Sequence, residues 1–204
     1  MELKMAFMYS PIAMLTLIAT IVVSYQALTS KQYLIDKLLL HPYSVVYRKE
    51  YYRLFTHGFV HADFAHLAFN MLTFYFFALG LERTVGHLHF AIIYFGSLVI
   101  SAVISTARRK DWEGFRSLGA SGAVSGILFS ISLYYPNAEF LVFFFLPVKA
   151  WLFAILFVGI SWYLSKNRYS VIDHEAHLWG ALTGAALTIL LNPGVIGIFL
   201  DGIF

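Results

Sequence analysis

GASGAVSGILFSISLYY, residues 119–135, is an apolar block without a charged side chain, and it begins with the sequence Gly-Ala-Ser-Gly. A helix needs about 20 predominantly apolar residues to cross a hydrocarbon core about 30 Å thick, and this block comes close to that length. The block therefore predicts a helix inside a membrane that carries a polar serine near its start.

Further apolar blocks flank this one on both sides along the chain. They fall at residues 9–28, 64–81, 89–107, 148–164 and 176–191. Hydrophobic residues make up 60% of the 204 residues and charged residues 12%, against about 45–50% and about 25% in an average soluble domain. We therefore predict an all-α membrane protein with six transmembrane helices, in which residues 1–204 form one transmembrane domain without a soluble domain.

Several blocks are short for a full crossing, so we expect either local thinning of the bilayer or helices that end inside the membrane in a protein-lined cavity. The first block has no small-residue cleavage pattern at its end and is predicted to be a span, not a removed signal peptide. Residues 31–55 mix tyrosines with basic residues and are expected at the membrane interface, as is the aromatic stretch 140–146.

Charge and cysteine content exclude some classes of function. The formal net charge of +3 would suggest nucleic acid in a soluble protein, but here the basic residues flank the apolar blocks, so no nucleic-acid partner is predicted. The chain has no cysteine, which excludes disulfides, thiolate metal sites and cysteine nucleophiles. Covalent catalysis would need another residue type.

Polar side chains occur where lipid would be expected. Each costs a few kcal/mol inside a span and is by default a functional hypothesis. His66 and Asn70 lie four residues apart, on one face of a helix. Ser121 begins the fourth block, and His177 lies near the start of the sixth. Because the second, fourth and sixth blocks enter the membrane from the same side, these four residues are expected at one depth.

A serine and a histidine at one depth suggest nucleophilic catalysis. The His177 ring can accept the proton of Ser121, and Asn70, His66 and backbone N–H groups near Ser121 can donate hydrogen bonds to a developing oxyanion. The acidic residue nearest to these candidates in sequence is Glu175, two positions before His177. The pattern does not support an acidic third member of a triad, and it therefore favours a Ser-His dyad.

Each of these features also has a purely structural explanation. His66 and Asn70 could bond between helices, and Ser121 could bond back to its own helix. Four glycines are expected to let the fourth and sixth helices pack closely, namely Gly122, Gly126, Gly180 and Gly184.

A metal site is a minor hypothesis. His57 and His61 are four residues apart just before the second block, but a third ligand at suitable spacing and a His-Glu-x-x-His sequence are both missing. We therefore predict no metal ion and no cofactor.

Taken together, these residues resemble the rhomboid family of intramembrane serine proteases. Single motifs are weak, but the ordered set covers about two thirds of the chain. The matching pieces are Arg53 with Phe55-Thr56-His57, His61, His66-x-x-x-Asn70, Gly80 with Glu82-Arg83 and Gly86, Gly119-x-Ser121-Gly122, and Ala176-His177-x-x-Gly180-x-x-x-Gly184.

The resemblance implies a rhomboid-like six-helix core with Ser121 as nucleophile, His177 as general base, and His66 and Asn70 near the oxyanion. It also implies that the substrates are transmembrane segments of other proteins, cleaved near a membrane face. Residues 31–55 would then be a membrane-associated first loop, and the fifth helix a lateral gate. We expect a multi-pass protein of a prokaryotic cell membrane, while the oligomeric state is not predicted.

The chain departs from the family pattern in two respects. The family often has an aromatic residue four positions after the nucleophile, stacked on the catalytic histidine, where this chain has Ser125. The second departure concerns orientation, because Lys4, Arg83 and Lys149 lie on one side of the predicted membrane and the other 11 Lys and Arg on the opposite side. The positive-inside rule would put that richer side in the cytoplasm. The family topology is the reverse, and we follow it.

Two other functions compete with proteolysis. One is a non-catalytic rhomboid-like binder of membrane helices, against which stands the presence of both Ser121 and His177. The other is a small transporter or channel with a histidine proton relay, against which stands the lack of corresponding Gly/Pro-broken helices in the two halves of the chain.

Overall fold

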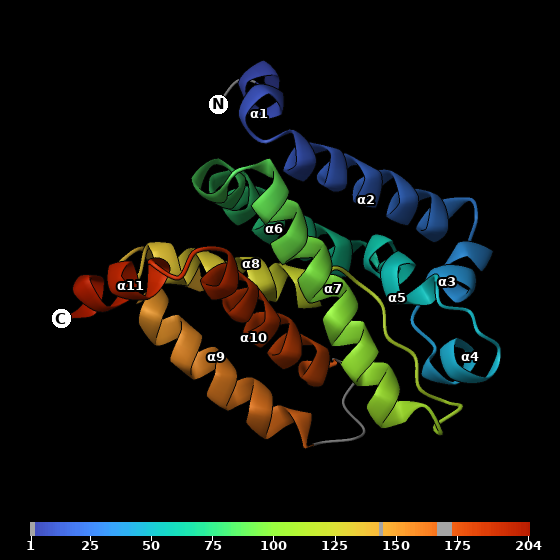
Figure 1. Ribbon diagram of the computed structural model, residues 1–204. Helices are drawn as coiled ribbons and strands as arrows, with labels where there is room; N and C mark the ends of the chain where they lie inside the picture. The colour runs from blue at the N-terminus through green and yellow to red at the C-terminus, as the bar shows by residue number, and fades with distance from the viewer. Residues whose placement is uncertain (1–2, 143–144, 167–172) are drawn as a thin grey trace.

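The computed structural model describes residues 3–142, 145–166 and 173–204. Most of these residues are helical (Figure 1). In chain order the elements are α1 (Leu3–Tyr9), α2 (Pro11–Thr29), α3 (Tyr33–Leu38), α4 (Pro42–Tyr47), α5 (Arg53–Thr56), the 3-10 turn η1 (His57–Phe59), α6 (Phe64–Val85), α7 (His87–Arg109), α8 (Ser121–Tyr134), β1 (Glu139–Val142), β2 (Leu146–Lys149), α9 (Ala150–Ser165), α10 (His174–Leu191) and α11 (Val195–Ile203).

Each of the six predicted apolar blocks corresponds to one helix, but these helices differ in length. Among the described residues, α2, α6 and α7 are long and apolar enough to cross a membrane, and α10 with α11 would make a fourth span if that pair, bent by 113°, counts as one. The helices α8 and α9 are shorter. At 1.5 Å per residue the 14 residues of α8 extend about 21 Å, less than the hydrocarbon thickness. The structure is thus a mainly helical membrane protein, and the count of six spans remains a prediction.

Helix α8 lies at the centre of the bundle. It packs against α6, α7, α9, α10 and α11, and every residue from 122 to 132 is buried (Figure 1). A helix that is apolar on all sides is stable only when neighbours cover it on all sides. Its first residue, Ser121, is half-buried, so α8 begins at the edge of this covered region.

Helices α8 and α10 approach at backbone distance. A Cβ atom built on Gly180 would overlap the carbonyl group of Gly122, and one built on Gly184 would overlap the backbone of Gly126. Side chains larger than hydrogen at these crossings would push the helices apart. These four glycines thus bring the start of α8 next to the first turns of α10.

Residues 31–55 fold into short helices instead of an extended loop. The buried Arg53 organises them, because its guanidinium donates hydrogen bonds to the carbonyls of Asp36 and Leu39, both at 2.8 Å. Leu40 also pairs with Ser117 in an isolated β-bridge. The segment is thereby connected to the residues that lead into α8.

The two ends of the aromatic stretch, residues 140–142 and 146, belong to a two-stranded antiparallel sheet, so the structure is not purely helical. Strand β1 pairs with β2 in a register that sets Glu139 opposite Lys149 and Phe140 opposite Val148. Residues 143–144 lie outside the described residues, as do residues 167–172 in the connection before α10. The stretch is too short for a helix to bury a face, and Pro147, which lacks a backbone N–H, suits a strand at a sheet edge.

Candidate active site

Ser121 and His177 meet where α8 and α10 begin. Ser121 is the first residue of α8, and His177 lies in the first turn of α10. The distance between Ser121 Oγ and His177 Nε2 is 2.6 Å, which is a hydrogen bond between residues 56 positions apart in the chain.

The other serines of α8 behave differently. Ser125, Ser130 and Ser132 each donate to the carbonyl four residues earlier, at 2.7–2.8 Å. This is the back-bonding common for serines inside apolar helices. Ser121 opens α8, so the residue four positions before it is not part of that helix, and its hydroxyl bonds to His177 instead.

The backbone before Ser121 requires glycine. Gly119 has a φ of +112°, a conformation that side-chain-bearing residues rarely adopt. A Cβ at this position would also lie 2.8 Å from Cε1 of His66. Gly119 donates its N–H to the carbonyl of His57 at 2.9 Å, which holds this turn against η1.

His61 supports the same turn from the side. Its Nε2 accepts the N–H of Ala120 at 3.3 Å, so the proton of the neutral ring lies on Nδ1, which donates to Ser24 Oγ at 2.9 Å. The Ser24 hydroxyl in turn donates to the carbonyl of Phe59 at 2.8 Å. Burial lowers the pKa of His61 to about 3, which keeps the ring neutral and able to accept.

His57 has a structural partner as well. Its Nδ1 donates to the Arg53 carbonyl at 3.1 Å, and burial lowers its pKa to about 4. Within the described residues, no group of three or more His, Cys, Asp or Glu is placed to hold a metal ion. The His57 ring thus bonds to α5, and the His61 ring to the turn before α8.

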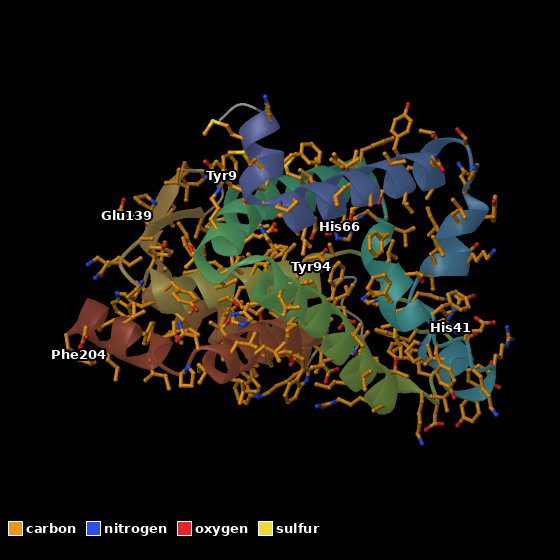
Figure 2. The ribbon with its side chains drawn as sticks, turned by 45° about the horizontal axis from the view of Figure 1, so that its top comes forward. Tyr9, His41, His66, Tyr94, Glu139 and Phe204 are labelled. Atoms are coloured by element: carbon orange, nitrogen blue, oxygen red, sulfur yellow. The ribbon has the colours of Figure 1, made fainter. Side chains whose placement is uncertain are left out.

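His66 and Asn70 lie on the face of α6 that borders the site. Asp63 caps this helix by accepting the N–H of His66 at 2.7 Å, and Asn70 donates to the His66 carbonyl at 3.0 Å. The rings of His61 and His66 stand edge to face, 4.9 Å apart. In Figure 2, the label of His66 lies between His41 at one end of the molecule and Phe204 at the other.

A cavity of about 570 Å³ joins these groups. Its lining includes Ser121, His177, His66 and Asn70, together with Phe157 of α9. The structure therefore brings the four residues proposed for the chemistry to one space, and it places Gly122, Gly126, Gly180 and Gly184 behind them, at the contact of α8 with α10.

Sequence reasoning overlooked Asp173 and Arg109. Asp173 caps α10 by accepting the N–H of Ala176 at 3.1 Å, and its carbonyl accepts the N–H of His177 at 3.2 Å. Arg109 at the end of α7 forms ion pairs with Asp173 and Glu175. An acidic residue three positions before an apolar helical run is a recognisable capping signal, and Asp173 stands at that distance from Ala176, where the apolar block begins.

This arrangement is suited to acyl transfer. A hydroxyl hydrogen-bonded to an imidazole can be deprotonated as it attacks a carbonyl carbon. The first N–H groups of α8 have no partner within the helix and lie at the positive end of its dipole, where negative charge is stabilised. The site thus contains a hydroxyl bonded to an imidazole, next to the helix N-terminus of α8, which is the geometry that such a reaction needs.

Comparison with known proteins agrees with this architecture. A family model described as the Rhomboid domain matches residues 48–194. The chain is 32% identical over 133 residues to "Rhomboid protein 1, mitochondrial" of Saccharomyces cerevisiae, covering 62% of this chain and 38% of that protein. It is 30% identical over 156 residues to "RHOMBOID-like protein 12, mitochondrial" of Arabidopsis thaliana, covering 69% and 46%.

A bacterial relative is matched over more of its length. "Putative rhomboid protease YdcA" of Bacillus subtilis is 32% identical over 147 residues, covering 69% of this chain and 67% of that protein. The chain spans less than half the length of the first two relatives. The family match covers most of the chain, including the Ser121 and His177 helices, and the chain therefore belongs to the rhomboid family.

Proposed function

We propose that this chain is an intramembrane serine endopeptidase that hydrolyses a peptide bond in or near the transmembrane segment of other membrane proteins. The observation that carries this proposal is the 2.6 Å hydrogen bond between Ser121 Oγ and His177 Nε2, in a cavity that His66 and Asn70 also line. The proposal includes six spans formed by a single domain, residues 1–204, in a prokaryotic cell membrane.

In the first half of the reaction, Ser121 Oγ attacks the carbonyl carbon of the scissile peptide bond while its proton passes to His177 Nε2. The tetrahedral intermediate then collapses. The bond from carbon to nitrogen breaks, His177 returns the proton to the leaving amine, and an ester to Ser121 remains. In the second half a water molecule attacks this ester with His177 again as base, which releases the acid product and restores the hydroxyl.

The oxyanion of each tetrahedral intermediate needs donors. The backbone N–H groups of the first turn of α8 are available because a helix leaves its first N–H groups without internal acceptors. The Asn70 amide has a second N–H besides the one given to the His66 carbonyl. His66 accepts the N–H of Ala62 at Nδ1, so Nε2–H is its donor. Losing one such donor typically slows a reaction by about 10²–10³.

The decisive experiment measures cleavage of a reporter transmembrane helix by purified protein in liposomes. Ser121→Ala and His177→Ala should each reduce the cleavage rate by at least about 10³, because removing either member of a nucleophile–base pair disables the unit. Ser132→Ala is the matched control, since its hydroxyl bonds back to Leu128 on the same helix and should keep the wild-type rate. Unchanged cleavage in both dyad variants would refute the proposal.

Labelling separates this proposal from the two alternatives. A fluorophosphonate should attach to wild-type protein on the peptide that contains Ser121, and not to Ser121→Ala. A non-catalytic binder of membrane helices would stay unlabelled. A proton-relay transporter would instead show proton flux into liposomes that His66→Ala abolishes and Ser121→Ala leaves intact.

A further inference from the structure

A cluster of ion pairs lies beside the reactive pair but is not used in the proposed chemistry. Arg109, the last residue of α7, places Nη1 at 3.3 Å from Asp173 Oδ1 and Nη2 at 2.9 Å from Glu175 Oε2. One guanidinium therefore contacts two carboxylates at the start of α10. A planar guanidinium is suited to this, because its donors are held in a fixed fork.

The cluster is shielded from water, which distinguishes it from ordinary surface ion pairs. The side chain of Arg109 is 18% exposed, and those of Asp173 and Glu175 are 10% and 9% exposed. Exposed pairs contribute little to structure, whereas breaking a buried pair leaves a charge without compensation. The Arg109 guanidinium also lies 4.4 Å above the Phe115 ring, which adds a cation–π contact.

Ser105 gives the cluster a second connection. Arg109 Nη1 donates to Ser105 Oγ at 3.0 Å, and the Ser105 hydroxyl donates to Asp173 Oδ2 at 3.3 Å. Both carboxylate oxygens of Asp173 are therefore contacted from α7. This residue is held against α7 by its side chain at two points.

Asp173 is also hydrogen-bonded to the first turn of α10, including the backbone of His177. Its side chain accepts the N–H of Ala176, and its carbonyl accepts the N–H of His177. The first turn of α10 thus has its position set by a residue bound to α7, while Ser121 belongs to α8. The Oγ–Nε2 distance depends on where α10 starts, and a displacement of about 1 Å in such a pair can cost about 10²-fold in rate.

We propose that Arg109 is a positioning residue for the Ser121–His177 pair, which it aligns by binding Asp173 and Glu175 at the start of α10. This inference rests on the proposed function. Arg109, Asp173 and Glu175 also line the same cavity as the reactive pair, so the cluster borders the space where a substrate chain would lie.

The test is a set of kinetic measurements on a transmembrane substrate with three variants. Arg109→Gln should lower kcat about tenfold or more with KM changed less than about twofold, because alignment and not substrate affinity is lost. Arg109→Lys keeps the charge without the fork and should recover part of kcat. Asp173→Asn keeps a good helix cap but loses the charge, and it should lower kcat as Arg109→Gln does.

A double variant tests whether the two residues act through one contact. Arg109→Gln with Asp173→Asn should be no slower than the slower single variant, since both changes remove the same contact. Arg108→Gln is the matched control. Arg108 is the neighbouring residue, its side chain is 61% exposed, and it pairs with Glu175 but not with Asp173, so kcat should stay within about twofold of wild type.

The outcomes also separate this inference from the proposed function. If wild-type protein neither cleaves nor takes up the fluorophosphonate, the proposed function fails first. If wild-type protein is active and kcat is unchanged in Arg109→Gln and Asp173→Asn, the positioning role alone is refuted. Should Arg109→Gln fail to fold, Asp173→Asn and Arg109→Lys decide, and a wild-type kcat in both would overturn the inference.

Discussion

The two sides of the active-site cavity are built differently. On one side, α8 and α10 touch through glycines, with backbone against backbone at Gly122 and Gly180. On the other side stands α9, whose buried residues are Ala150 and Ser161, and whose residues between these two are half-buried or exposed. Helix α9 reaches α8 through aromatic rings, for example Phe157 and Phe129 with centroids 5.5 Å apart.

The two kinds of contact differ in how easily they can be displaced. Contact between backbones cannot yield without separating whole helices, whereas contact between aromatic rings can yield by rotation of side chains. The α8–α10 side therefore holds Ser121 and His177 in register. We predict that the α9 side is the one that yields to a helical substrate, as expected of a lateral gate.

The largest effect is expected at the glycine contact. Gly180→Leu would drive a side chain into the Gly122 backbone, separate α8 from α10 and reduce the cleavage rate by more than about 10²-fold. Gly159→Leu is the matched control on α9, since a Cβ there meets nothing within 4 Å, and it should keep the wild-type rate. Equal activity of the two variants in liposomes would show that the two sides do not differ.

Sequence reasoning predicted the helices better than their environment. All six apolar blocks became helices, because long apolar runs fold no other way in a membrane. The hairpin of β1 and β2 was not predicted, because four-residue strands have almost no periodic signal. The bend of 113° between α10 and α11 was missed as well, although Pro193 lies between the two helices.

At the site, Ser121 and His177 could be found because polar residues stand out in apolar blocks. Their separation of 2.6 Å could not be derived, since it depends on tertiary contacts at glycines and on the start of α10. Arg109 carried no such signal. It stands in a charged run at the end of a helix, where arginines are common, and its two acidic partners lie more than 60 positions later in the chain.

His61 supports the turn that leads into α8, on the α8–α10 side of the cavity. Acidification should weaken this support. The pKa of His61 in the folded protein, about 3, lies below its ordinary value near 6.5, and the same holds for His57 at about 4. The free energy of unfolding therefore has its full value above pH 6.5. Below pH 6.5 the free energy of unfolding decreases as the unfolded state takes up protons, by about 1.4 kcal/mol per pH unit for each histidine, until the folded pKa is approached.

Thermal unfolding in detergent from pH 7.5 to pH 4.5 measures this dependence. His61→Gln keeps an acceptor for the Ala120 N–H without a titrating ring, so its stability should decline less steeply than that of the wild type. Parallel curves for the two proteins would exclude His61 as a source of the acid sensitivity.

A smaller effect is expected from the hydroxyl contact further along the same helix pair. Thr188 on α10 donates to Ser130 Oγ on α8 at 2.7 Å, and both are fully buried. Thr188→Val should cost about 0.6–1 kcal/mol and lower Tm by about 2–4 °C, because hydrogen bonds between membrane helices contribute little individually. Thr29→Val is the control, since this exposed hydroxyl bonds to Tyr25 in its own helix and should leave Tm unchanged. Equal Tm values for both variants would mean that glycine packing alone holds α8 to α10.

The smallest change in cleavage rate is expected on the α9 side. Phe157→Ala removes the ring that packs on Phe129, and because Phe157 is half-buried the loss of stability should be near 1 kcal/mol, below the roughly 3–5 kcal/mol of a fully buried phenylalanine. Cleavage of a transmembrane substrate should become about twofold faster, since loosening α9 eases entry without moving Ser121 or His177. Ile160→Ala, an exposed change on the same helix, should leave the rate unchanged. A slower Phe157→Ala protein would instead mean that α9 helps to align Ser121 with His177. The proposed difference between the α8–α10 side and the α9 side would then be wrong.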